Sequence, residues 1–86
     1  MPLANYEVDF LVEKNEKVLK LIQVCYDLSN IETYKRETRS LLIAGGELEC
    51  NNLIIINPEK ETTKEFKFDG KNQIIKLVTA YNILND

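Results

Sequence analysis

The sequence predicts an α/β (α+β) domain with a mixed central sheet of about five strands, in the order β-β-α-β-β-β, and a short C-terminal helix. Three observations support this prediction: residues 6–13 alternate between apolar and polar, two apolar runs of strand length occupy 18–26 and 52–58, and the segment 30–44 between them is amphipathic. A chain of 86 residues is long enough for a single domain, 1–86, and no more. Strand, helix and strand at this spacing form a right-handed parallel crossover.

The first two strands are predicted to have different environments. The strand over 6–13 has one apolar face, which consists of Tyr6, Val8, Phe10 and Val12. The run over 18–26 is almost continuously apolar, so we expect a central strand that is covered on both faces.

A helix is predicted from Asn30 to Ala44. Ser29 and Glu32 have the spacing of a capping box, and Gly45 with Gly46 is expected to end the helix. Its apolar stripe at helical spacing consists of Ile31, Tyr34, Thr38, Leu41 and Leu42. The charged residues that lie largely outside this stripe are Lys35, Arg36, Glu37 and Arg39.

The C-terminal part of the chain is predicted to complete the sheet. The run over 52–58 is a buried-type strand that ends at Pro58, and a weaker strand follows over 64–68. Asp69 and Gly70 form a turn signal before a strand over 74–78. A short helix is predicted from about Thr79 to Leu84.

The composition excludes several functional classes. A formal net charge of −3 gives the chain no overall positive field to attract nucleic acid, so any nucleic-acid binding would have to rest on a local patch. Because there is no histidine, the usual zinc ligand sets and Ser-His or Cys-His nucleophilic catalysis are excluded. The sequence lacks a phosphate-binding loop, so any ATPase activity must come from outside this chain. With no apolar run of membrane length and no secretory signal, we expect a cytoplasmic protein that does not bind membranes.

The loop between the first two strands decides which side chains meet. A loop of odd length over 15–17, with Lys14 opposite Val18, places Asp9 across from Gln23, Glu7 across from Cys25 and Leu11 across from Leu21. A loop of even length would separate them. We expect the odd loop, because it also gathers the leucines of both strands into one apolar patch.

Four segments carry a resemblance to a known family. They are Glu7-Val8-Asp9-Phe10, the run LIQVCYDLS over 21–29, Arg36-Glu37, and Leu41-Leu42. In these segments, and over nearly its whole length, the chain resembles the DUF4143 domain, the C-terminal region of predicted AAA-type ATPases of archaea and bacteria.

The resemblance implies a PD-(D/E)XK, restriction-endonuclease-like fold, in which an Asp on one strand and a Glu-x-Lys on its neighbour build a magnesium site. Asp9 would occupy the Asp position, Gln23 the Glu position and Cys25 the Lys position. That fold normally opens with a helix and a strand ahead of the Asp-bearing strand, but only residues 1–5 precede Tyr6 here. We therefore expect a truncated core and a C-terminal fragment of a longer ATPase.

Two of the three site positions depart from the catalytic pattern. Magnesium prefers carboxylate oxygens, so the neutral amide of Gln23 weakens the site. The thiol of Cys25 cannot replace a lysine that orients water and offsets phosphate charge, and Lys20 has the wrong parity to do so. We expect a vestigial site that is not catalytic, with no cofactor in this chain; Glu7, Asp9 and Gln23 are weak metal candidates. ATP and magnesium are expected for the parent ATPase module.

The leading hypothesis is a non-catalytic accessory domain that packs against, or regulates, the ATPase module. Two alternatives stay open. One is a metal-dependent DNA nuclease whose displaced cation comes from Lys35, Arg36 or Arg39. The other is a stand-alone protein-interaction module. The same three cations are candidate interaction residues, although a solvated helix face with a Glu32–Arg36 pair is the simpler interpretation. An unpaired strand edge also predicts self-association.

Single residues have simple structural interpretations too. Glu7 and Asp9 are typical of the solvated face of an edge strand, and Cys25 is typical of a small buried apolar residue. Gln23 is the exception, because a buried amide needs hydrogen-bond partners and Asp9 is a suitable one.

Overall fold

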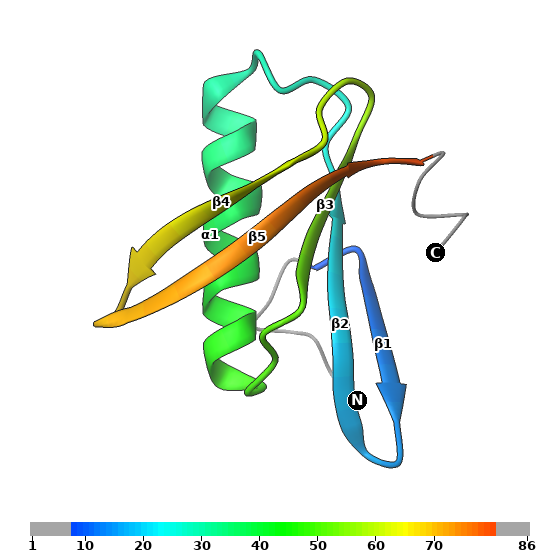
Figure 1. Ribbon diagram of the computed structural model, residues 1–86, viewed down its shortest axis with the longest axis vertical. Coiled ribbons are helices and arrows are strands. Elements are labelled where there is room, and N and C mark those ends of the chain that lie inside the picture. Colours follow the sequence, from blue (N-terminus) through cyan, green and yellow to red (C-terminus); the bar gives the residue numbers. More distant parts are fainter. Residues whose placement is uncertain (1–7, 81–86) are drawn as a thin grey trace.

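The structure is a computed structural model that describes residues 8–80 (Figure 1). These residues form β1 (Phe10–Lys14), β2 (Lys17–Val24), α1 (Ile31–Glu47), β3 (Leu53–Asn57), β4 (Thr62–Phe68) and β5 (Lys71–Thr79). A mixed five-stranded sheet with one long helix confirms the predicted α/β class. Within residues 8–80, no helix is both long and apolar enough to cross a membrane.

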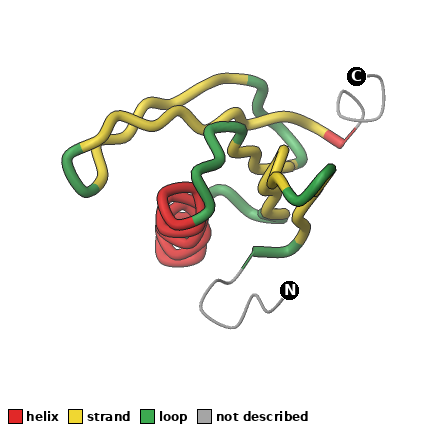
Figure 2. Tube along the Cα trace, turned by 90° about the horizontal axis from the view of Figure 1, so that it is seen from below, coloured by secondary structure: helices red, strands yellow, loops and turns green. Residues whose placement is uncertain are grey.

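The strands lie in the order β1-β2-β3-β5-β4. β2 and β3 are parallel and are connected through α1, as the strand-helix-strand pattern predicts. β3 and β5 are also parallel, whereas the neighbouring pairs β1–β2 and β4–β5 are antiparallel. α1 packs against β2 and β3, and Figure 2, which looks along the helix, shows it on one side of the sheet. Among the described strands, β1 and β4 are therefore the two outer ones.

The core lies between α1 and the side of the sheet that faces it. Leu21, Leu53 and Ile75 pair across three neighbouring strands, and each is at most 1% exposed. Leu41 and Ala44 of α1 are fully buried in the same cluster. Because apolar burial is the main favourable contribution to folding, this layer holds α1 in place over the sheet.

Within the part of the chain that the structure describes, no helix covers the opposite side of the sheet, and this corrects two predictions. Phe10 and Val12, which the alternation assigned to an apolar core face, are 57% and 39% exposed. Leu11 of β1 packs against the core instead, opposite Leu21. The prediction that the second strand is covered on both faces is also wrong for the described residues. A period of two identifies the apolar face of a strand but not whether another element covers it.

The hairpin between β1 and β2 has a two-residue turn, so the predicted odd loop is wrong. Asn15 and Glu16 have φ values of 53° and 66°, the left-handed conformations of a type I′ turn, and Lys14 pairs with Lys17. The register then shifts between Val12 and Glu13, where one extra residue of β2 bulges out. Beyond this bulge Leu11 pairs with Leu21, as predicted.

The start of α1 differs by one residue from the prediction. The N-cap is Asn30, whose Oδ1 accepts a hydrogen bond from the backbone N–H of Thr33 at 3.1 Å. The predicted cap, Ser29, instead donates through its backbone N–H and its hydroxyl to Asp27 Oδ1. These two hydrogen bonds lower the pKa of Asp27.

The end of α1 corrects a larger error. The helix continues through Gly45 and Gly46 to Glu47. A Cβ atom on Gly45 would lie only 3.0 Å from both the carbonyl oxygen of Cys50 and a side-chain carbon of Leu53. Gly45 is therefore a site of close helix–strand approach, not a helix stop.

The C-terminal strands are longer than predicted. β5 begins at Lys71 and ends at Thr79, so Thr79 belongs to a strand and not to a helix. The predicted turn at Asp69 and Gly70 is present, with φ values of 54° and 78°. Residues 81–84 of the predicted C-terminal helix lie outside the described residues.

Candidate functional site

The side chains of Asp9 and Gln23 meet beside the start of β1. The backbone N–H of Asp9 donates to Gln23 Oε1 at 2.8 Å, and the backbone N–H of Val24 donates to Asp9 Oδ2 at 2.8 Å. The side chain of Gln23 therefore accepts from the backbone of Asp9, and the side chain of Asp9 accepts from the backbone of Val24, the residue after Gln23. This reciprocal pair continues the attachment of the chain to β2 after the β1 ladder has ended at Phe10. The predicted position of Asp9 across from Gln23 agrees with this geometry.

Burial differs sharply between the residues of the predicted site. Gln23 and Cys25 are 2% and 1% exposed, whereas Asp9 is exposed. Gln23 lies in the core row with Ile55 and Leu77, on the side of the sheet that α1 covers. A buried amide whose oxygen accepts a hydrogen bond fits the structural requirement for polar groups in a core. Glu7, predicted across from Cys25, lies outside the described residues.

The thiol of Cys25 is held in its neutral form. Burial raises its pKa, and the nearby carboxylate of Glu37 raises it further. The thiol also makes a weak contact with the backbone carbonyl of Asp27, at 3.7 Å. A neutral thiol carries no positive charge, so Cys25 does not supply what a catalytic lysine would.

Glu37 of α1 is the residue of this site that sequence reasoning missed. Its Oε2 is buried and has no hydrogen-bond partner among the described residues, apart from the weak donor Cys25. Burial raises the pKa of Glu37, and the negative charge of Asp9 raises it further, while Cys25 and Arg36 act in the opposite direction. The one signal in the sequence is helical spacing: Glu37 follows Tyr34 by three residues and precedes Leu41 by four, so it lies beside the apolar stripe of the helix.

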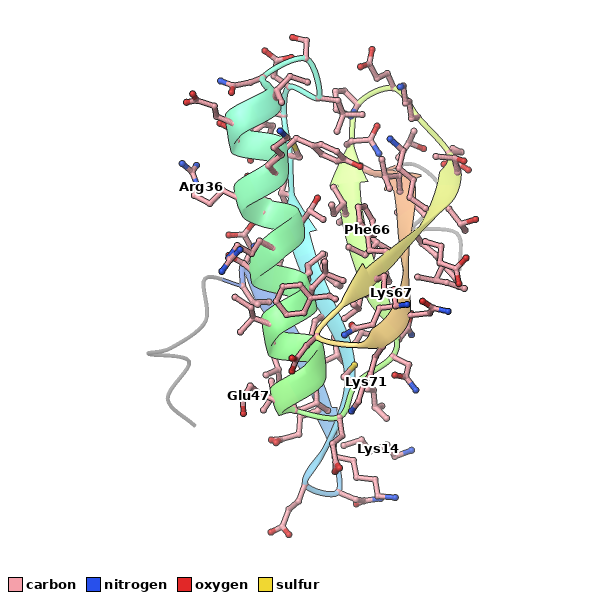
Figure 3. The ribbon with its side chains drawn as sticks, turned by 90° about the vertical axis from the view of Figure 1, so that its left-hand side faces the viewer. Lys14, Arg36, Glu47, Phe66, Lys67 and Lys71 are labelled. Atoms are coloured by element: carbon pink, nitrogen blue, oxygen red, sulfur yellow. The ribbon has the colours of Figure 1, made fainter. Side chains whose placement is uncertain are left out.

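The three predicted interaction residues do not form one cluster. Lys35 and Arg39 line a groove between α1 and β4. Figure 3 shows Arg36 projecting from the side of α1 that is turned away from β4. Lys20 pairs with Val12 and has the opposite parity to Cys25, so it lies on the other side of the sheet, as predicted.

The residues that are present do not fit a magnesium ion. Of Asp9, Gln23 and Cys25 only Asp9 carries a carboxylate, and one of its oxygens already accepts the N–H of Val24. The oxygen of Gln23 is bonded to Asp9. In residues 8–80 there is no group of three or more Cys, Asp or Glu side chains that could hold a metal ion.

Replacing Glu37 with glutamine is expected to stabilise the protein near neutral pH and to have less effect in acid. A raised pKa means that the folded protein holds the Glu37 proton more tightly than the unfolded chain. The wild type therefore loses stability as the pH rises from the ordinary glutamate pKa through the raised one, and Glu37→Gln does not. Thermal unfolding of both proteins as a function of pH measures the difference. A difference in melting temperature that is constant with pH would contradict this assignment.

Comparison with known proteins gives no match: no family model, no curated protein and no solved structure is similar to this chain.

Proposed function

We propose that this chain is a non-catalytic accessory domain with a degenerate nuclease-like site, and that its partner is the ATPase module of a longer AAA-type protein. The reciprocal hydrogen bonds between Asp9 and the Gln23–Val24 segment carry the proposal. They use, for internal structure, the oxygens that a nuclease of this type would present to a metal ion. The restriction-endonuclease-like core is part of the same proposal, supported by the sequence resemblance and by the parallel β2-α1-β3 crossover.

The chemistry of the neighbouring groups supports a role without catalysis. Phosphodiester cleavage needs a cation or a metal ion to offset the charge that develops on the phosphate. The side chains that gather here are the carboxylates of Asp9 and Glu37, the amide of Gln23 and the neutral thiol of Cys25. This set is negative or neutral, so it repels a phosphate instead of stabilising it.

One observation favours the nuclease alternative. Glu37 brings a second carboxylate within electrostatic reach of Asp9, which a two-carboxylate metal site would require. In this interpretation Arg36, which acts on the charge of Glu37, is the candidate among the helix cations.

Cleavage assays separate the two functions. We expect that the wild type, incubated with supercoiled and branched DNA in Mg²⁺ or Mn²⁺, cleaves no faster than Asp9→Asn. This substitution removes the charge but keeps an oxygen that can accept from Val24, so folding is preserved better than with alanine. Cleavage by the wild type that is lost in Asp9→Asn would overturn the accessory proposal.

The gene gives a second test, which addresses the partner. The proposal expects a phosphate-binding loop to be encoded upstream of Met1 in the same reading frame. An in-frame stop codon directly upstream would instead favour a stand-alone interaction module.

A further inference from the structure

A groove runs between α1 and the outer strand β4, and its floor is apolar. Ile31 and Leu42 line it from the helix, and Phe66 and Phe68 line it from the strand. Ile31 is 56% exposed, which leaves a large apolar side chain open to solvent. Apolar surface of this kind, at the junction of two elements, is typical of a binding groove.

The rim of the groove is positively charged. Lys35 and Arg39 line its helix side, and none of the residues that line the groove is acidic. Lys64 of β4 lies over the ring of Tyr34, with its ammonium group 5.3 Å from the ring centre. No ion pair of these three cations is seen within residues 8–80. In a chain with a net charge of −3, a rim of unpaired cations favours an anionic partner.

Two polar atoms in the groove lack the partners that buried groups require. Thr38 is 6% exposed, and its hydroxyl has no hydrogen-bond partner among the described residues. The buried hydroxyl of Tyr34 is in the same state, and both residues line the groove. A buried hydroxyl without a partner is costly, and both of these hydroxyls belong to residues that line the groove.

The backbone of β4 adds a third kind of contact. β4 pairs with β5 on one side and is the last strand of the described sheet on the other. Its outer N–H and C=O groups therefore form an open edge beside the groove. A strand added to this edge would direct every second side chain toward α1, because side chains alternate between the two faces of a sheet.

We propose that this groove binds an acidic, apolar peptide segment of a partner protein, which adds to β4 as a new strand. Apolar side chains of the peptide rest on Phe66 and Phe68, and its carboxylates face Lys35 and Arg39. The open strand edge favours a peptide over a nucleic acid, which gains most of its affinity from a larger number of cations. The proposal does not rest on the Asp9 site, so each can fail without the other.

Binding can be measured with a labelled, acetylated and amidated peptide in which Leu and Ile alternate with Asp and Glu. We expect Lys35→Glu/Arg39→Glu to weaken binding by roughly tenfold. Arg36→Glu reverses one charge on the other side of α1 and is the matched control for the single variants Lys35→Glu and Arg39→Glu, with an expected effect of less than about twofold. Circular dichroism of each variant checks that the exposed substitutions leave the fold intact.

Modified peptides test strand addition itself. An added strand turns alternate N–H groups toward β4, so N-methylation of one alternating set should abolish binding and N-methylation of the other set should not. Amide resonances of Thr62–Phe68 should shift when the unmodified peptide is added.

Three results would overturn the proposal. They are equal loss of binding in Arg36→Glu and in the Lys35→Glu/Arg39→Glu variant, resonance shifts that avoid β4, and tighter binding of single-stranded oligothymidine than of the acidic peptide.

Discussion

Replacing Asn57 with alanine is expected to lower the free energy of unfolding by about 2–4 kcal/mol. Asn57 is the last residue of β3 and is 3% exposed. Its Oδ1 accepts from the backbone N–H groups of Glu59 and Lys60, at 2.9 and 2.6 Å. Its Nδ2 donates to the backbone carbonyls of Lys60 and Val78, at 3.0 and 3.2 Å. Alanine would remove all four of these hydrogen bonds from the end of β3, and small domains have only about 5–15 kcal/mol of stability in total.

Thermal unfolding of Asn57→Ala checks this expectation. The melting temperature should fall by at least about 8 °C for a domain of this size. Asn51→Ala is the matched control, because Asn51 is exposed and makes no side-chain hydrogen bond in the described structure. Asn57→Asp keeps both acceptor positions but replaces the donors with a charged oxygen that faces two carbonyls, so it should be at least as destabilising near neutral pH. A melting temperature of Asn57→Ala close to that of Asn51→Ala would contradict the role of this side chain.

The strands were more predictable from the sequence than the hairpin that joins the first two of them. Apolar runs identified the buried strands because burial leaves a period-two or continuous apolar pattern in any sequence. The hairpin turn was predicted wrongly, since Asn15-Glu16 is not among the common Asn-Gly or Asp-Gly signals for a type I′ turn. The pairing of Leu11 with Leu21 was still correct, because the bulge at Leu19 compensates for the shorter turn. Bulges leave no periodic signal, so the correct register had a different cause from the predicted one.

The candidate site was predictable only where it depends on which face of a strand each side chain occupies. Asp9 and Gln23 were placed together by counting along two strands, but Glu37 comes from α1 and needed knowledge of how the helix sits on the sheet. Charged residues are mostly exposed, so a glutamate beside the apolar stripe is usually taken as solvated. The Gly45-Gly46 pair was misread for a related reason, because a glycine needed for close packing looks the same in sequence as one that ends a helix.

Replacing Gln23 with glutamate is expected to have the largest effect at the candidate site. Gln23 is 2% exposed, and the new carboxylate would share its surroundings with Asp9 and with Glu37, whose pKa is already raised. A buried negative charge close to other carboxylates should lower the free energy of unfolding by about 2–4 kcal/mol near neutral pH. The pKa of the new group would be raised in the folded state, so the loss should grow as the pH rises and shrink in acid.

Adding Mg²⁺ to Gln23→Glu tests whether the new carboxylate only destabilises the protein or also completes a metal site with Asp9. If the position descends from a metal-binding carboxylate, Mg²⁺ should raise the melting temperature of Gln23→Glu, but not that of the wild type or of Gln23→Glu/Asp9→Asn, at matched ionic strength. Gln23→Met has a similar length without the amide, and its loss of stability measures what the amide contributes, including its hydrogen bond to Asp9, without adding a charge. An equal response of the wild type and Gln23→Glu to Mg²⁺ would contradict the assignment, because the amide would then not be what prevents metal binding. A response in Gln23→Glu alone would identify the change from a carboxylate to an amide at position 23 as sufficient to disable the site.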